Sequence, residues 1–148
     1  MTTDTERSVK TLDGSCLCGD VRFSVDGPIR GIGQCHCSLC RKSSGVNGSM
    51  VFLVPKDRFR WLQGEERVKT WKLRETYSSI RCERCSSPMP ASFDGEHFWV
   101  PPGLMDDDLD ATVSLHHHVA SKADWDELPK DLPQYDAYPP REVVFENE

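Results

Sequence analysis

The spacing of the cysteines constrains this chain more than any other feature. Its 148 residues include seven cysteines, an odd number that disulfides alone cannot use. In a reducing cytosol, clustered cysteines hold metal more often than they form bridges. They fall into a C-x-C pair, a C-x-C-x-x-C triplet and a C-x-x-C pair: Cys16/Cys18, Cys35/Cys37/Cys40 and Cys82/Cys85. Such regular spacing predicts metal binding, with zinc as the expected ion.

Composition and charge define the class of protein. Hydrophobic residues make up 37% and charged residues 28%, which is typical of a single soluble domain with a buried core. No apolar run approaches the ~20 residues of a membrane-spanning helix, and the N-terminus has no apolar signal segment. We therefore expect a cytoplasmic protein without a membrane partner. A net charge of −6 argues against nucleic-acid binding, because phosphate backbones repel acidic surfaces.

Two cysteine pairs that are far apart in the sequence match a structural zinc site. Zinc at such a site takes four tetrahedral ligands, and the thiolates of Cys16, Cys18, Cys82 and Cys85 satisfy it completely. The metal would fix the first strand to the centre of the chain, and structural zinc contributes on the order of 10–16 kcal/mol in isolated peptides. A redox role for the second pair is the alternative. A thioredoxin-like motif should open a helix, however, and Pro88 follows this pair instead.

The remaining triplet, Cys35, Cys37 and Cys40, predicts a second and chemically open zinc site. Three thiolates leave the fourth position free, which is what separates a catalytic zinc from a structural one. Such a site suits a soft ligand such as a substrate thiolate. A fourth ligand from the chain would close it. His36 is one alternative, although both of its neighbours are expected ligands, and the histidines at 116, 117 and 118 are another.

Hydrophobic periodicity predicts a β-rich domain of short strands and many turns. Alternation is clearest over 20–26, where Val21, Phe23 and Val25 share one face. Further strands are expected over 49–54, 67–73, 76–81, 97–100 and 111–119, and helical turns over 41–44 and 121–128. The triplet is expected in a loop, and residues 1–13 and the tail from 129 should lack regular structure.

Four parts of the sequence resemble a known family. They are residues 14–23 (GSCLCGDVRF), 35–42 (CHCSLCRK) followed by Gly45, 103–107 (GLMDD), and a closing pattern of His116, Val119, 121–123 (SKA), Trp125 and 132–135 (LPQY). Together they resemble the glutathione-dependent formaldehyde-activating enzymes, whose domain is shared with centromere protein V. The resemblance runs from about residue 13 to 136, and the two cysteine motifs make it highly specific.

This resemblance implies a mainly β, Mss4-like zinc-bound fold of short antiparallel sheets with brief helices. It divides the chain into a flexible N-terminus at 1–12, a zinc domain at 13–136 and a C-terminal tail at 137–148. It also implies that Cys35, Cys37 and Cys40 hold a catalytic zinc and the other four cysteines a structural one. The family usually has an aromatic residue before the last pair and glycine after it. Arg81 and Ser86 stand there in this chain, so the turn after the pair can differ.

Two functions from different classes follow. The first is a zinc-dependent carbon–sulfur lyase acting on a small thiol adduct such as S-hydroxymethylglutathione, which glutathione and formaldehyde form. Arg41 or Lys42 could then orient an anionic substrate, and the histidines at 116 to 118 could carry protons. Surface ion pairing and packing are the alternative roles of these residues. The second function is a non-catalytic zinc module that binds a protein partner, in which the triplet forms a second structural zinc site.

Overall fold

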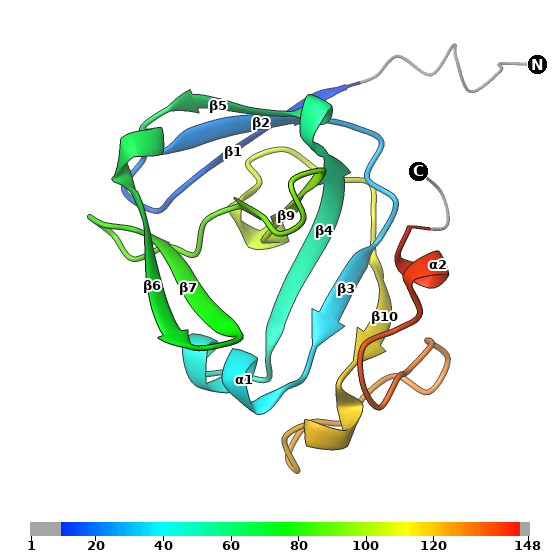
Figure 1. The fold of residues 1–148 in the computed structure, drawn as a ribbon. Coiled ribbons are helices and arrows are strands. Elements are labelled where there is room, and N and C mark those ends of the chain that lie inside the picture. The colour runs from blue at the N-terminus through cyan, green and yellow to red at the C-terminus, as the bar shows by residue number, and fades with distance from the viewer. Residues whose placement is uncertain (1–9, 146–148) are drawn as a thin grey trace, which may run out of the picture.

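The computed structural model describes residues 10–145, which form a domain of short strands (Figure 1). The strands are β1 (Thr11–Ser15), β2 (Arg22–Asp26), β3 (Ile32–Cys35), β4 (Ser49–Pro55), β5 (Phe59–Gln63), β6 (Val68–Arg74), β7 (Tyr77–Cys82), β8 (Ala91–Ser92), β9 (His97–Val100) and β10 (Val113–His117). The helices are α1 (Ser38–Ser44) and α2 (Arg141–Val144), with 3₁₀ turns η1 (Lys56–Arg58), η2 (Glu65–Arg67), η3 (Pro102–Leu104) and η4 (Val119–Ser121). The mainly β fold is therefore confirmed. Among the described residues, no helix has the length and apolar character needed to cross a membrane.

A three-stranded sheet in the order β1-β2-β5 forms one wall of the core. The predicted alternation is confirmed, since Val21, Phe23 and Val25 are all fully buried. Phe23 stacks on Phe59 of β5 with 5.5 Å between the ring centroids. Phe59 in turn stacks on Phe98 of β9 at 4.1 Å. These rings join the sheet to the larger sheet that contains β9.

The larger sheet has five strands in the order β10-β3-β4-β9-β8. Its neighbouring strands are antiparallel, as expected, except β10 and β3, which run parallel. In this parallel register His117 lies opposite Cys35. Because parallel strands end at the same edge of a sheet, the histidines after β10 lie beside the cysteine triplet that follows β3.

Strands β6 and β7 form a separate two-stranded sheet whose tip lies beside α1 (Figure 1). Both strands were expected from the sequence within a residue or two of their observed ends. Arg81 of β7 donates to the carbonyl oxygen of Ser43 in α1 at 2.7 Å and to that of Ser86 at 3.1 Å. The arginine that replaces the family's aromatic residue thus links the last cysteine turn to α1.

The helix predicted over 121–128 does not form. The chain makes only the single turn η4, after which Lys122 is extended with φ −60° and ψ 154°. The carboxylate of Asp126 accepts a hydrogen bond from Asn47 at 3.3 Å and lies 3.4 Å from the Nδ1 atom of His36. These tertiary contacts outweigh the local capping pattern, as they often do for weak helix signals.

Several elements lie where the sequence predicted none. Strand β1 begins at Thr11, although most of the N-terminal segment expected to be flexible at 1–12 lies outside the described residues. Strands β3 and β5 and helix α2 were also missed. Cys35 ends β3 rather than lying in a loop, and α1 begins at Ser38, so that it includes Cys40.

The turn after Cys85 adopts a backbone conformation that favours glycine. Ser86 has a φ of 64°, a left-handed conformation that costs a non-glycine residue roughly 1–2 kcal/mol. Its N–H donates to the carbonyl oxygen of Cys82 at 2.9 Å. Serine in place of the family's glycine is therefore accommodated as local backbone strain.

Gly48 is expected to tolerate alanine much less well than Gly45. A Cβ added at Gly48, where φ is 143°, would overlap the carbonyl oxygen of Cys35, whereas one added at Gly45, where φ is 75°, would meet nothing within 4 Å. Both substitutions are strained by the positive φ, but only Gly48→Ala forces Cys35 to move. Its free energy of unfolding should fall at least about 2 kcal/mol further than that of Gly45→Ala. Urea denaturation measures both, and equal losses would contradict the close approach.

Candidate metal centres and the adjoining pocket

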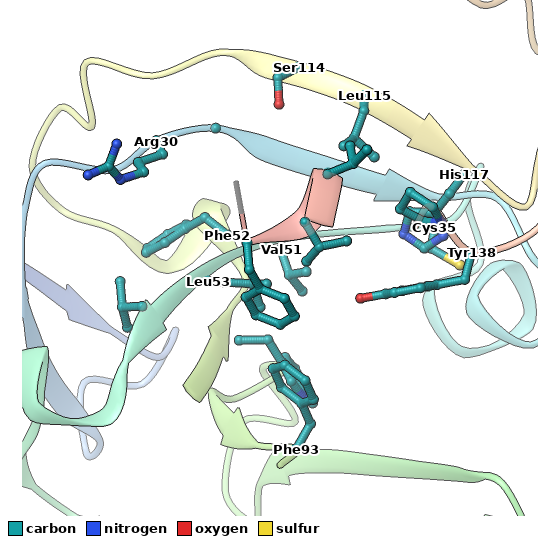
Figure 2. A pocket seen from close by; sticks show the side chains of 18 of the residues that line it. Arg30, Cys35, Val51, Phe52, Leu53, Phe93, Ser114, Leu115, His117 and Tyr138 are labelled. Atoms are coloured by element: carbon teal, nitrogen blue, oxygen red, sulfur yellow. The ribbon is translucent and has the colours of Figure 1, made fainter. Parts of the chain in front are cut away.

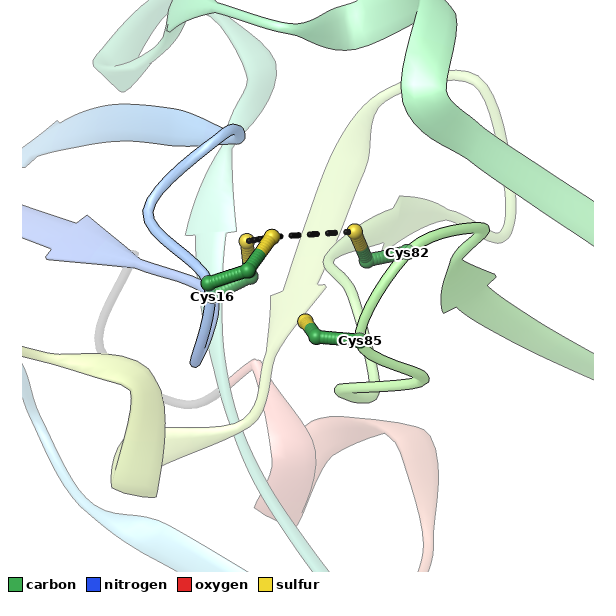
Figure 3. A group of neighbouring side chains, drawn as sticks. Cys16, Cys82 and Cys85 are labelled. Carbon is green, nitrogen blue, oxygen red and sulfur yellow. Dashed lines mark hydrogen bonds between the residues drawn. The ribbon is translucent and has the colours of Figure 1, made fainter.

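Cys16, Cys18, Cys82 and Cys85 lie together and are called here the four-cysteine cluster. Their sulfur atoms all lie within 4.8 Å of one another. The first two come from the turn between β1 and β2, and the other two from the end of β7 and the turn after it. Figure 3 shows the thiols of Cys16, Cys82 and Cys85 pointing toward a common centre from these two sides.

The spacing of these sulfur atoms fits a tetrahedral metal site. The Sγ atoms of Cys16 and Cys18 are 3.5 Å apart, and those of Cys18 and Cys82 are 3.9 Å apart. Four sulfur atoms at about 2.3 Å from a tetrahedral zinc ion would be about 3.8 Å from one another. The cluster could therefore hold a metal ion without rearrangement.

The electrostatics of the four-cysteine cluster favour a cation. At Cys18 a backbone N–H from Asp20 favours the thiolate, yet burial and hydrogen bonds with the other three thiols raise the pKa to about 12. At Cys85 burial opposes ionisation, but hydrogen bonds from Ser87 and the backbone lower the pKa to about 5. The thiols therefore share protons, because neighbouring thiolates repel one another. A divalent cation would allow all four to ionise.

Cys35, Cys37 and Cys40 form a second group, the three-cysteine set, with sulfur atoms within 4.8 Å of one another. Cys35 ends β3, Cys37 is the N-cap residue of α1, and Cys40 lies in that helix. The Sγ atom of Cys37 accepts a hydrogen bond from the backbone N–H of Cys40 at 3.3 Å. The strand end and the helix start thus hold the three thiols at one point, and this set too could bind a metal ion.

One thiol of the three-cysteine set ionises more easily than an ordinary cysteine. A hydrogen bond from Cys35 lowers the pKa of Cys40 to about 5, against the opposing effect of burial, and Ser49 and Tyr77 also donate to it. The same hydrogen bond, together with burial, raises the pKa of Cys35. The pair therefore holds one shared proton when no metal is bound.

A pocket of about 670 Å³ opens on the three-cysteine set. Cys35 and Cys40 line one end of it together with Tyr77, His117 and Tyr138. The middle is apolar and is lined by residues that include Val51, Leu53, Trp99, Leu115 and Phe145. Figure 2 shows Arg30 at the opposite end from Cys35, His117 and Tyr138. None of the four-cysteine cluster lines this pocket.

The histidines are divided between two places. His36 and His116 form a buried pair with 2.9 Å between Nε2 and Nδ1, and the other ring nitrogen of His36 faces Asp126. Both ring nitrogens of His36 therefore face other residues, which argues against His36 as a metal ligand. His117 and His118 instead lie beside Cys35 at the pocket. Burial lowers the pKa of His36 and His116, and lowers that of His117 to about 4, so these rings are neutral near pH 7.

The basic pair that could have oriented an anionic substrate lies outside the pocket. Neither Arg41 nor Lys42 lines it, whereas Arg30 and Arg58 do. No sequence pattern indicates Arg30 and Arg58, because their proximity to the pocket depends on how β3, β4 and β5 pack. The redox reading of the last cysteine pair also finds no support, since Cys82 and its partner face Cys16 and no helix follows them.

Comparisons with known proteins show the family and the fold to which this chain is similar. Residues 11–121 match the family model of the glutathione-dependent formaldehyde-activating enzyme. A Halomonas elongata protein, provisionally named as such an enzyme, is 31% identical over 129 residues, which cover 79% of this chain and 80% of the relative. A crystal structure of a Rhodobacter sphaeroides protein is similar in fold, with a TM-score of 0.50 and 17% identity over 68% of this chain and 99% of that one. The family match includes all seven cysteines, and the chain belongs to the glutathione-dependent formaldehyde-activating enzyme family.

Proposed function

We propose that this chain is a zinc-dependent carbon–sulfur lyase with one structural zinc ion in the four-cysteine cluster and one catalytic ion in the three-cysteine set. Its substrate is a small thiol adduct, such as S-hydroxymethylglutathione, or the glutathione and aldehyde from which the adduct forms. Family membership and the donor sets of the two clusters support this proposal. Free thiolates need a reducing compartment, so we place the protein in the cytoplasm.

The observation that carries the proposal is the different access to the two clusters. The pocket reaches Cys35 and Cys40 but none of the four-cysteine cluster. Four thiolates fill the coordination of zinc, whereas three leave a position for a substrate atom. A metal at the three-cysteine set could therefore exchange a ligand with the pocket, and one in the four-cysteine cluster could not.

The reaction forms one bond and moves one proton. The thiol sulfur bonds to the carbonyl carbon as the carbonyl double bond becomes a single bond, and the proton of the thiol moves to the carbonyl oxygen; the lyase direction reverses these changes. Zinc, when bound, would keep the thiol sulfur ionised or polarise the carbonyl group. Cys35, Cys37 and Cys40 hold that position, and Tyr77 supports it by donating to the sulfur of Cys40 at 4.0 Å. The apolar middle of the pocket limits access of water to the adduct.

The far end of the pocket suits an anionic thiol. Glutathione carries two carboxylates and one ammonium group, and guanidinium groups bind carboxylates through paired hydrogen bonds. Arg30 lies at the end remote from Cys35 (Figure 2), and Arg58 also lines the pocket. A glutathione molecule with its sulfur at Cys35 would place a carboxylate toward Arg30.

The second candidate is a non-catalytic zinc module that binds a protein. It draws on exposed apolar side chains: Leu17, between two cysteines of the four-cysteine cluster, is 86% exposed and Trp125 is 66% exposed. Under this hypothesis the three-cysteine set is a second structural zinc site. The consequences of losing Cys35 distinguish the two candidates.

Replacing Cys35 by serine should leave the protein folded while removing one of two zinc ions and abolishing the response to glutathione. Cys82→Ser, the matched substitution in the four-cysteine cluster, should instead lower Tm sharply, because that metal joins distant parts of the chain. Metal analysis and thermal unfolding with and without glutathione measure these effects. A wild-type chain with a single zinc ion and no shift of Tm in glutathione would contradict the enzyme. Equal destabilisation by both substitutions would favour the non-catalytic zinc module, in which both metal sites are structural.

The two arginines give a second expected outcome. Replacing both Arg30 and Arg58 by glutamine should raise KM for glutathione at least about tenfold with little change in kcat, because a lost charge-assisted hydrogen bond costs about 1.5–3 kcal/mol of binding. Arg41→Gln is the matched control, since Arg41 does not line the pocket. Steady-state kinetics at varied glutathione measure both, and an unchanged KM in the double variant would exclude this binding mode.

A further inference from the structure

His117 and His118 present their rings to the same side of the chain, which two neighbours in a regular strand do not do. Strand β10 ends at His117, and His118 has a φ of 56° and a ψ of 33°, in the left-handed region. This turn brings the two rings together, with 2.7 Å between their Nδ1 atoms and 5.0 Å between ring centroids. The backbone conformation thus creates a pair of adjacent imidazole nitrogens, called here the histidine pair.

The histidine pair lies against one member of the three-cysteine set. The parallel pairing of β10 with β3 places His117 opposite Cys35, and the Nδ1 atom of His118 lies 3.7 Å from the Sγ atom of Cys35. A thiolate and an imidazole bound to one tetrahedral zinc ion would be about 3.5 Å apart, given Zn–S of about 2.3 Å and Zn–N of about 2.0 Å. One donor atom from each of these three residues lies within 4.8 Å of the others. The spacing is therefore that of shared coordination.

The surroundings leave the histidine pair available for a metal. His36 and His116 are fully or almost fully buried and bond each other, whereas His117 and His118 are only partly buried and border the pocket through His117. The ring of Tyr138 packs against both members, at 5.2 Å and 6.4 Å between centroids. At 2.7 Å one Nδ1 atom must donate a proton to the other, and a metal ion can take the place of that proton.

We propose that His118, held in place by His117, is a nitrogen ligand to metal bound at Cys35. Cys35 belongs both to the three-cysteine set and to the group that it forms with the histidine pair, so His118 can supply a nitrogen donor from the side of Cys35 when no substrate thiol is present. Mixed thiolate and imidazole donors suit zinc, which is borderline in softness. This inference rests on the proposed binding of a metal at the three-cysteine set, and it adds a ligand that the spacing of the cysteines does not contain.

Isotope-edited NMR of the histidine ring nitrogens in the full chain, followed during zinc titration, tests the proposal. The chemical shift of a ring nitrogen of His118 should change as the second zinc ion binds, while the ring resonances of the buried His36 and His116 serve as internal references. In His118→Asn the affinity for that ion should fall at least about tenfold, comparable with the loss when a metal's ligand shell is disturbed. Asparagine tolerates the left-handed backbone of residue 118, so this variant keeps the fold. Tyr135→Phe, at a tyrosine that does not line the pocket, is the control and should bind zinc as the wild type does.

The outcomes separate this inference from the function on which it rests. If the second zinc ion binds while the chemical shifts of the His118 ring nitrogens stay unchanged, His118 is not a ligand and only this inference fails. An unchanged zinc affinity in His118→Asn has the same meaning. If no second ion loads at all, the proposed catalytic metal fails and this inference fails with it.

Discussion

The meeting of four sulfur atoms between two turns is the contact on which the rest of the structure depends. It joins Cys18, in the turn between β1 and β2, to Cys82 at the end of β7, which lies 64 residues further along the chain. The β6–β7 hairpin forms a sheet of its own, and an isolated two-stranded sheet is marginally stable in water. A metal in the four-cysteine cluster would therefore anchor this hairpin to the first sheet. Arg81 makes a second connection from the hairpin to α1, at the other candidate metal centre.

The parallel pairing of β10 with β3 determines what surrounds the three-cysteine set. It brings the histidine pair to Cys35 and gives the pocket a wall that contains Leu115 and His117. One end of the pocket thereby carries thiols and a histidine and the other carries Arg30, with apolar side chains between them. This order matches a thiol that is reactive at one end and anionic at the other. The four-cysteine cluster, outside this pocket, is left with a structural role in our proposal.

The sequence predicted those parts of the molecule that depend on local patterns. Cysteine spacing anticipated both clusters, and alternation anticipated the burial of Val21, Phe23 and Val25. Strand β3 was missed because it has only four residues, one of them glycine, and no clear alternation. The left-handed turn at His118 and the pocket arginines depend on the pairing of distant strands, which no local pattern reports. The helix expected over 121–128 failed for the same reason, since Asp126 is engaged by residues far away in the sequence.

Thermal unfolding of the zinc-loaded and the chelated protein tests the central claim most directly. If zinc in the four-cysteine cluster holds the first sheet and the β6–β7 hairpin together, removal of zinc should abolish cooperative unfolding or lower Tm by tens of degrees. That loss follows because a structural zinc site contributes on the order of 10 kcal/mol, which is comparable with the whole stability of a domain. Zinc returned to the chelated protein should restore the transition. A chelated protein that keeps its wild-type Tm, with metal analysis showing that no zinc remains, would contradict the account.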